Sequence, residues 1–170
     1  MSMIKSCGYS HLHRFFEPKI LKKTVNGISS KMKKFKKDIP FDYVCLTGIS
    51  GAAIGFPVCV RMGYNPLFIR KSQDKTHSSF MIEGYVEKLK ENENIKYVII
   101  DDLIDSGKTI NRIIKTMKNA FNHSECVGIF LYNHDKEILG HTPGDKVVVK
   151  SPDGNLIPIT MLPINDPFFK

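Results

Sequence analysis

One stretch of this chain limits its fold more than any other. Residues 97–109 begin with a short apolar run, continue with the paired acids Asp101 and Asp102, and end in a small polar turn that contains Gly107. A short continuous apolar run is typical of a buried parallel strand. Residues 109–117 then repeat apolar side chains at helical spacing, so the turn joins a strand to a helix. The sequence therefore predicts an α/β protein with polar groups where this strand ends.

The turn has the composition of a phosphate-binding site. In open α/β sheets ligands bind at the carboxyl ends of strands, and the N–H groups of a helix N-terminus favour an anion. Ser106 and Thr109 supply hydroxyl donors, and Gly107 lets the backbone approach a ligand closely. Asp101 and Asp102 can accept hydrogen bonds from vicinal hydroxyls or hold the waters around a Mg²⁺ ion. A metal ion would also offset the repulsion between these acids and a phosphate.

Three other interpretations of this segment are open. Residues 107–109 end like a P-loop, but a P-loop has glycine at the position of Asp102. An acidic pocket like that of response regulators also places aspartates at strand ends, although the polar turn has no role there. The third interpretation is a purely structural turn in which Asp105 or Ser106 caps the helix.

The order of these residues resembles the phosphoribosyl-diphosphate (PRPP) signature of type I phosphoribosyltransferases. Residues 98–109 match its apolar strand, two acids, two apolar residues and small-residue loop, and residues 104–109 are most similar to the hypoxanthine-guanine branch. The resemblance implies a parallel sheet flanked by helices, with a small variable hood over the nucleobase. It assigns the ribose hydroxyls, and a Mg²⁺ ion held through water, to Asp101 and Asp102. It assigns the 5′-phosphate to Asp105, Ser106, Gly107, Lys108 and Thr109.

Two further segments resemble the pyrophosphate-binding parts of the family. Residues 43–57 read as strand, glycine-rich turn and helix, and the small residues of the turn are expected to leave backbone amides uncovered. Small residues also serve close packing of a helix on a sheet. Residues 65–71 form a short strand before two cations, as in the adenine and orotate branches, although Gly51 stands where the adenine branch often has arginine. The residues expected to bind pyrophosphate are Gly48, Ile49, Ser50, Gly51, Ala52, Arg70 and Lys71.

The resemblance also gives candidates for catalysis. In the hypoxanthine-guanine branch the aspartate that matches Asp105 exchanges a proton with the purine ring, whereas other branches lack it. Residues 72–79 are polar and lack helical periodicity, and they correspond to a family loop that closes over the site. Within them Lys75 and His77 resemble the lysine and histidine of the orotate loop, and we expect them to be catalytic. The alternative for both is a solvated surface loop.

The 170 residues fit a single domain. We divide it into a basic or hood segment at 1–40, a core at 41–132 and a C-terminal part at 133–170 that supplies a hood or a sheet edge. The sequence has no Cys-x-x-Cys pair, and Cys45 and Cys59 lie in apolar segments, so we expect reduced thiols and a cytoplasmic protein. No stretch has the apolar length of a signal region or a membrane span, so we expect no membrane insertion.

The formal net charge of +8 is concentrated near the N-terminus. Residues 19–37 contain eight lysines and no acid. Val25, Ile28, Met32 and Phe35 recur there at helical spacing, which predicts an amphipathic helix with lysines on its outer face. A solvated face is the favoured interpretation, and attraction of an anionic ligand or RNA is the alternative.

The remaining segments continue an alternation of strands and helices. We expect a helix at 53–62, a helix or strand–helix piece at 82–90, a strand at 125–132, and short strands at 146–150 and 156–160 joined by a turn at 151–154. The hood comes from residues 11–17 or 132–170, with Phe15, Phe16 and Tyr132 as candidates for base stacking, although aromatic residues more often belong to the core.

Together these features predict an enzyme that uses Mg²⁺ and transfers the phosphoribosyl group of PRPP to a nucleobase. A purine is favoured, an orotate-like pyrimidine stays open, and a homodimer is expected because dimers are common in this family. The alternative is a non-catalytic PRPP sensor that regulates transcription or RNA through the lysine-rich segment at 19–37, although nucleic acid is not the favoured partner. A PRPP synthase is disfavoured because the chain is too short for that enzyme's paired domains.

Overall fold

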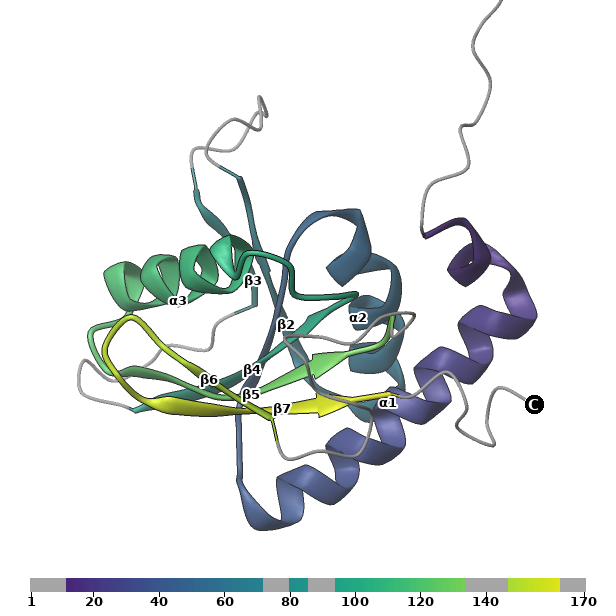
Figure 1. The fold of residues 1–170 in the computed structure, drawn as a ribbon, viewed down its shortest axis with the longest axis horizontal. Coiled ribbons are helices and arrows are strands. Elements are labelled where there is room, and N and C mark those ends of the chain that lie inside the picture. The colour runs from purple at the N-terminus through teal and green to yellow at the C-terminus, as the bar shows by residue number, and fades with distance from the viewer. Residues whose placement is uncertain (1–11, 72–79, 86–93, 134–146, 163–170) are drawn as a thin grey trace, which may run out of the picture.

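A computed structural model of the chain describes residues 12–71, 80–85, 94–133 and 147–162. Its strands are β1 (Tyr43–Leu46), β2 (Asn65–Ile69), β3 (Ile82–Gly84), β4 (Ile95–Asp101), β5 (Ser124–Leu131), β6 (Val147–Lys150) and β7 (Leu156–Met161). They form one seven-stranded sheet in the order β3-β2-β1-β4-β5-β7-β6 (Figure 1). The five inner strands are parallel, whereas β3 and β6 are antiparallel to their neighbours at the two edges.

Helices cover both faces of this sheet. They are the 3₁₀ helix η1 (His13–Phe16) and the α-helices α1 (Pro18–Asp38), α2 (Gly48–Met62) and α3 (Lys108–Ala120). Helices α1 and α2 lie on one face and α3 lies on the other, as the two separate apolar clusters of the core also indicate (Figure 1). The predicted α/β class, with a largely parallel sheet between helices, is confirmed.

Strand β4 explains why its sequence is apolar at consecutive positions. Tyr97 and Ile99 face the cluster under α3, while Val98 and Ile100 face the cluster under α1 and α2, and all four are fully buried. A strand covered on both faces needs apolar residues on both sides of its pleat. Because β4 is the central strand, the apolar run ends with Asp101 at the carboxyl-terminal end of the middle of the sheet.

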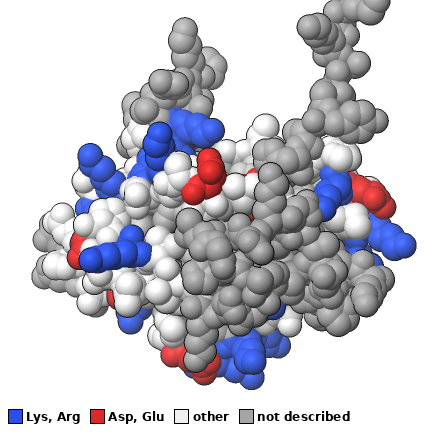
Figure 2. Space-filling view, in the orientation of Figure 1, with Lys and Arg blue, Asp and Glu red and all other residues white. Residues whose placement is uncertain are grey.

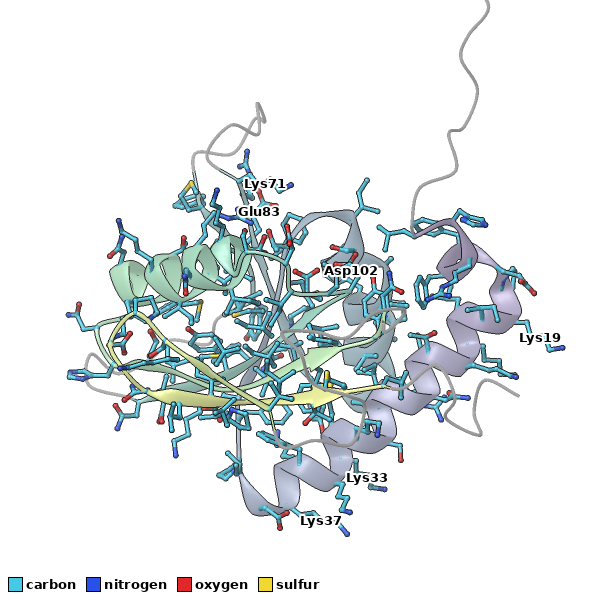
Figure 3. All side chains as sticks on the ribbon, viewed as in Figure 1. Lys19, Lys33, Lys37, Lys71, Glu83 and Asp102 are labelled. Atoms are coloured by element: carbon cyan, nitrogen blue, oxygen red, sulfur yellow. The ribbon has the colours of Figure 1, made fainter. Side chains whose placement is uncertain are left out.

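Helix α1 has the amphipathic character predicted for it. Ile28 and Met32 are fully buried against the sheet. Lys19, Lys33 and Lys37 are exposed along its length (Figure 3), whereas Lys36 packs over the rings of Phe41 and Tyr64. Figure 2 shows blue side chains gathered at the lower edge of the molecule, where the C-terminal part of α1 lies. A solvated cationic face is what this helix presents.

Two predicted element boundaries differ from the structure. Helix α2 begins at Gly48, earlier than the predicted residue 53, so the expected glycine-rich turn is the first turn of the helix. In the 82–90 segment the structure has the short strand β3, and residues 86–93 lie outside the described residues. The predicted strand at 125–132 and the two C-terminal strands are confirmed, and they form β5 and the hairpin β6–β7. The hairpin extends the sheet because β7 pairs in parallel with β5.

The described cysteines are free thiols. Cys45 and Cys59 are buried in the core, as predicted, and Cys126 is partly buried. Burial raises the pKa of Cys59 to about 12 and that of Cys126 to about 12. Among the residues that the structure describes, none of the helices has the length and apolarity needed to span a bilayer.

Candidate functional site

A cavity of about 520 Å³ opens where β1, β2 and β4 end. Its walls come from residues 47–50 at the start of α2, from Lys71 after β2, and from residues 101–110 between β4 and α3. Leu12 contributes from the N-terminal segment. Lys71 and Asp102 lie toward the same side of the molecule in Figure 3. Parallel strands end at one edge, which is why segments distant in sequence meet there.

The acid pair lines this cavity with little exposed surface. Asp101 is 4% exposed and Asp102 is 6% exposed. The Ser50 hydroxyl donates a hydrogen bond of 2.7 Å to Asp101 Oδ1, and the Asp102 amide donates one of 3.0 Å to the same oxygen. Burial raises the pKa of Asp101 to about 7, and the charge of Asp102 adds to that effect while the Ser50 hydrogen bond opposes it. A carboxyl in this state ionises readily once a cation approaches.

The turn between the acids and α3 is open to solvent and to the cavity. Asp105, Ser106 and Lys108 are exposed, and Gly107 has a φ of 71°. A Cβ atom at Gly107 would meet no atom within 4 Å, so the backbone there is uncovered. Helix α3 begins at Lys108, and the first N–H groups of an α-helix have no partner within the helix. The turn thus combines hydroxyls, backbone donors and a helix N-terminus, which together suit an anion.

The first turn of α2 forms the facing wall. Gly48, with a φ of 60°, Ile49 and Ser50 all line the cavity. The expectation of an uncovered amide at Gly51 is wrong, because that N–H donates to the Thr47 carbonyl at 3.2 Å. A Cβ at Gly51 would lie 3.1 Å from the carbonyl oxygen of Ile100, so this glycine permits close packing of α2 on the sheet. Ala52 lies within α2 and is not part of the cavity wall.

The two cations after β2 have different surroundings. Lys71 is exposed and lines the cavity. Arg70 is only 6% exposed, and its Nη1 lies 3.2 Å from Glu83 Oε1 and donates to the Phe80 carbonyl at 3.3 Å. The described contacts of the Arg70 guanidinium therefore point toward β3 and not into the cavity. Lys75 and His77 lie outside the described residues.

Two residues of the site were not predicted. The Thr47 hydroxyl, which lines the cavity, donates to the Ile69 carbonyl at 2.7 Å and accepts a hydrogen bond of 2.9 Å from Arg112 Nη2. Arg112 Nη1 donates to the Arg70 carbonyl at 2.9 Å. Thr47 could have been noticed as a hydroxyl at a strand end, but nothing local connects Arg112 with segments so distant in sequence.

Two of the three aromatic candidates for base stacking, Phe15 and Tyr132, make core contacts. Phe15 and Tyr132 are buried and pack edge to face, with ring centroids 4.9 Å apart. The Tyr132 hydroxyl donates to the Ser50 carbonyl at 2.7 Å and so supports the start of α2. Phe16 is half exposed. These contacts place Phe15 and Tyr132 in the core next to the cavity, as the alternative interpretation of the aromatic residues predicted.

The ligands available at this site suit Mg²⁺ better than a metal ion that takes all of its ligands from the protein. Among the described residues there is no cluster of three or more His, Cys, Asp and Glu side chains. Mg²⁺ commonly takes one or two carboxylates and completes its shell with waters and ligand phosphates. Asp101 and Asp102 could provide the protein share of such a shell.

The proteins that are similar to this chain were found among solved structures. Neither models of protein families nor curated protein sequences match this chain. An adenine phosphoribosyltransferase structure matches with a TM-score of 0.60 at 13% identity, over 86% of this chain and 82% of that one. The orotate phosphoribosyltransferase of Francisella tularensis matches with a TM-score of 0.56 at 15% identity, over 86% and 67%.

A third structure is a longer protein. Leishmania donovani UMP synthase matches with a TM-score of 0.55 at 21% identity over 73% of this chain. The present chain spans only a quarter of that protein's length. At such low identities these similarities concern the fold.

Proposed function

We propose that this chain, which has the type I phosphoribosyltransferase fold, transfers the 5-phosphoribosyl group of PRPP to a nucleobase and releases pyrophosphate. One observation carries the proposal: the acid pair, the start of α3 and the start of α2 line a single cavity, with Lys71 on its wall. PRPP carries a 5′-phosphate, two ribose hydroxyls and a diphosphate, and each of these groups has a chemically suitable partner there.

The turn before α3 would bind the 5′-phosphate. Ser106 and Thr109 offer hydroxyls, the N-terminus of α3 offers N–H groups, and Lys108 adds a positive charge. Gly107 leaves its side of the cavity without a side chain. The exposed Asp105 would exchange a proton with a purine ring, the role that the resemblance to the hypoxanthine-guanine branch implies.

Asp101 and Asp102 would hold the ribose hydroxyls and the waters of a Mg²⁺ shell. The ion, when bound with the diphosphate, would neutralise part of the charge that develops on the leaving group. Ser50 and the Asp102 amide fix the orientation of the Asp101 carboxylate before the substrate arrives. A carboxylate held in this way needs little reorganisation during the reaction.

The start of α2 and Lys71 would bind the pyrophosphate. Gly48, Ile49 and Ser50 belong to the helix N-terminus and line the cavity, and Lys71 supplies a cation. In the reaction a nitrogen of the base forms a bond to the anomeric carbon while the bond from that carbon to the pyrophosphate oxygen breaks. Positive charge builds on the sugar, so the chain's task is to align the reactants and exclude water. Lys75 and His77, outside the described residues, are proposed to act over the site.

The acceptor is proposed to be a purine, with orotate as the alternative. Residues 104–109 resemble the hypoxanthine-guanine branch, whereas Arg70 and Lys71 resemble the adenine and orotate branches. Adenine and orotate phosphoribosyltransferases are both among the similar structures. Free thiols at Cys45 and Cys59 agree with a reducing compartment and support a cytoplasmic location.

The proposal is tested by pyrophosphate release from PRPP with Mg²⁺ and a panel of free bases: adenine, hypoxanthine, guanine, xanthine, uracil and orotate. Mass spectrometry of the nucleotide formed identifies the acceptor. The control is the double variant Asp101→Asn/Asp102→Asn, which keeps the size of both side chains and should release no pyrophosphate. PRPP binding without turnover on any base would favour a PRPP sensor, and no PRPP binding would refute the proposed donor site.

We also propose that the protein forms a homodimer through the outer side of α2. Phe56 and Val60 are 41% and 85% exposed and lie one helical turn apart on this helix. Residues 48–60 contain no charged side chain. A chain with a net charge of +8 repels its own copies, so a neutral apolar face is where two copies can approach. A symmetric contact would pair this face with itself.

Sedimentation velocity tests the homodimer. Val60→Glu places a charge in the neutral face and should produce a monomer, whereas Val148→Glu, at an exposed site on β6, should leave the dimer intact. A monomeric parent protein, or a dimer that tolerates Val60→Glu, would exclude this interface.

A further inference from the structure

We infer that Arg112 is a positioning residue that couples the 5′-phosphate half of the cavity to its pyrophosphate half. The inference rests on the proposed function of the cavity. It concerns a side chain that does not line the cavity and that the PRPP signature at 98–109 does not include. Arg112 lies on α3, just after the turn assigned to the 5′-phosphate.

The guanidinium of Arg112 joins three elements of the fold. Its Nη1 donates to the carbonyl of Arg70 at 2.9 Å, and its Nη2 donates to the hydroxyl of Thr47 at 2.9 Å. Thr47 in turn donates to the carbonyl of Ile69 at 2.7 Å. One side chain of α3 thus holds both the end of β1 and the end of β2.

Each anchor lies next to a residue of the pyrophosphate wall. Thr47 directly precedes Gly48 at the start of α2, and Arg70 directly precedes Lys71. The turn at 105–109 leads directly into helix α3. Because β1 lies between β4 and β2, the sheet ties the turn to Lys71 only through β1. Arg112 provides a direct link.

The chemistry of arginine suits this role. The planar guanidinium offers several N–H donors in a fixed fork, so two acceptors on different strands can be held at a set separation. Its anchors are a backbone carbonyl and a hydroxyl, with no carboxylate at either hydrogen bond. PRPP must contact both halves of the cavity at once, and pyrophosphate must contact the two wall segments that Arg112 anchors. The affinities of both ligands therefore depend on the spacing that Arg112 holds, whereas the affinity of ribose 5-phosphate does not.

Three probes separate this role from a general structural one. Calorimetry on the full chain with Mg²⁺ would measure the affinities of PRPP, inorganic pyrophosphate and ribose 5-phosphate. For Arg112→Met we expect PRPP and pyrophosphate to bind about tenfold more weakly, the size of one lost charge-assisted hydrogen bond. Ribose 5-phosphate, which needs the turn before α3 and the acid pair but not the pyrophosphate wall, should bind as tightly as it does to the parent.

Two further variants sharpen the test. Lys115→Met removes a positive charge from an exposed position on the same helix and should change none of the three affinities. Arg112→Lys keeps the charge but lacks the fork, so it should restore the PRPP affinity only in part. If Arg112→Met fails to fold, the ratio of PRPP to ribose 5-phosphate affinity in Arg112→Lys still measures the coupling.

Each outcome has a distinct meaning. A selective loss of PRPP and pyrophosphate binding supports the coupling. An equal loss of all three ligands overturns it in favour of a structural role, and unchanged PRPP affinity overturns it outright. If the parent protein binds none of the three, the proposed function fails first and the inference fails with it.

Discussion

Replacing Asp101 with asparagine isolates the cost of a buried charge in the site. Asp101 is 4% exposed, and its Oδ1 accepts hydrogen bonds from Ser50 and from the Asp102 amide. Burial is the main reason why the pKa of Asp101 rises from 3.8 to about 7. Asparagine keeps an oxygen for both hydrogen bonds and removes only the ionisable group. The variant therefore changes the electrostatics of the site and little else.

The direction of the change in stability follows from the pH at which the folded and the unfolded protein release the proton of Asp101. The unfolded chain releases it near pH 3.8 and the folded protein releases it near pH 7, so rising pH between these values favours unfolding. The contribution of Asp101 to stability is intact below the unfolded pKa and is lost as the pH passes through the folded pKa. One proton is worth about 1.4 kcal/mol per pH unit, which gives up to about 4 kcal/mol over the whole window. Asparagine carries no such dependence.

Urea unfolding at several pH values measures this difference. Between about pH 5 and about pH 7 the stability of Asp101→Asn should gain about 2 kcal/mol relative to the parent. Asp105→Asn is the matched control, because Asp105 is exposed and its carboxylate keeps its hydration on folding. Parallel pH profiles for Asp101→Asn and the parent would refute the claim that burial opposes ionisation of Asp101.

Three further predictions concern packing and the ends of the site. Gly55→Ala should lower the free energy of unfolding by about 1–3 kcal/mol, because a Cβ there would lie 2.0 Å from Leu46 Cδ2, and an unchanged urea midpoint would contradict this. Ser106→Ala and Thr109→Ala should each weaken PRPP binding by about 1–2 kcal/mol in calorimetry, and unaltered affinity in both would exclude the phosphate site. Asp105→Asn should slow turnover on a purine and leave PRPP affinity nearly intact, whereas equal losses would argue against proton transfer.

The sequence was most informative where local pattern and burial coincide. The run at 98–100 is apolar because both faces of β4 are covered, and the helical repeat at 109–117 corresponds to the buried side of α3. The sequence therefore predicts that the turn between them lies at a strand end, and the structure has it between β4 and α3. The C-terminal hairpin was also predictable, since the residues at 151–154 favour a turn and Gly154 adopts a φ of 89°.

The sequence was least informative where a residue's role depends on distance. Gly51 looked like an uncovered backbone position, but its lack of a side chain serves an approach of α2 to Ile100 that only the packed structure defines. Arg70 and Lys71 are adjacent cations after β2, but only Lys71 lines the cavity, whereas Arg70 contacts Phe80 and Glu83. Arg112 touches β1 and β2 through hydrogen bonds that no local pattern encodes.

The packing of α1 has a consequence for how the chain matures during synthesis. A Cβ at Gly27 would lie 2.8 Å from Leu162 Cδ1. The side chain of Leu162, the residue after β7, therefore packs directly against α1 at Gly27. At typical ribosomal rates of about 5–20 residues per second, that side chain is added roughly 6–25 seconds after the helix. In that interval the lysines of α1 are solvated, but part of its apolar face lacks its native cover. A nascent chain that stops before Leu162 should therefore be open to proteases and chaperones at α1, although every residue of the proposed PRPP site has already been made.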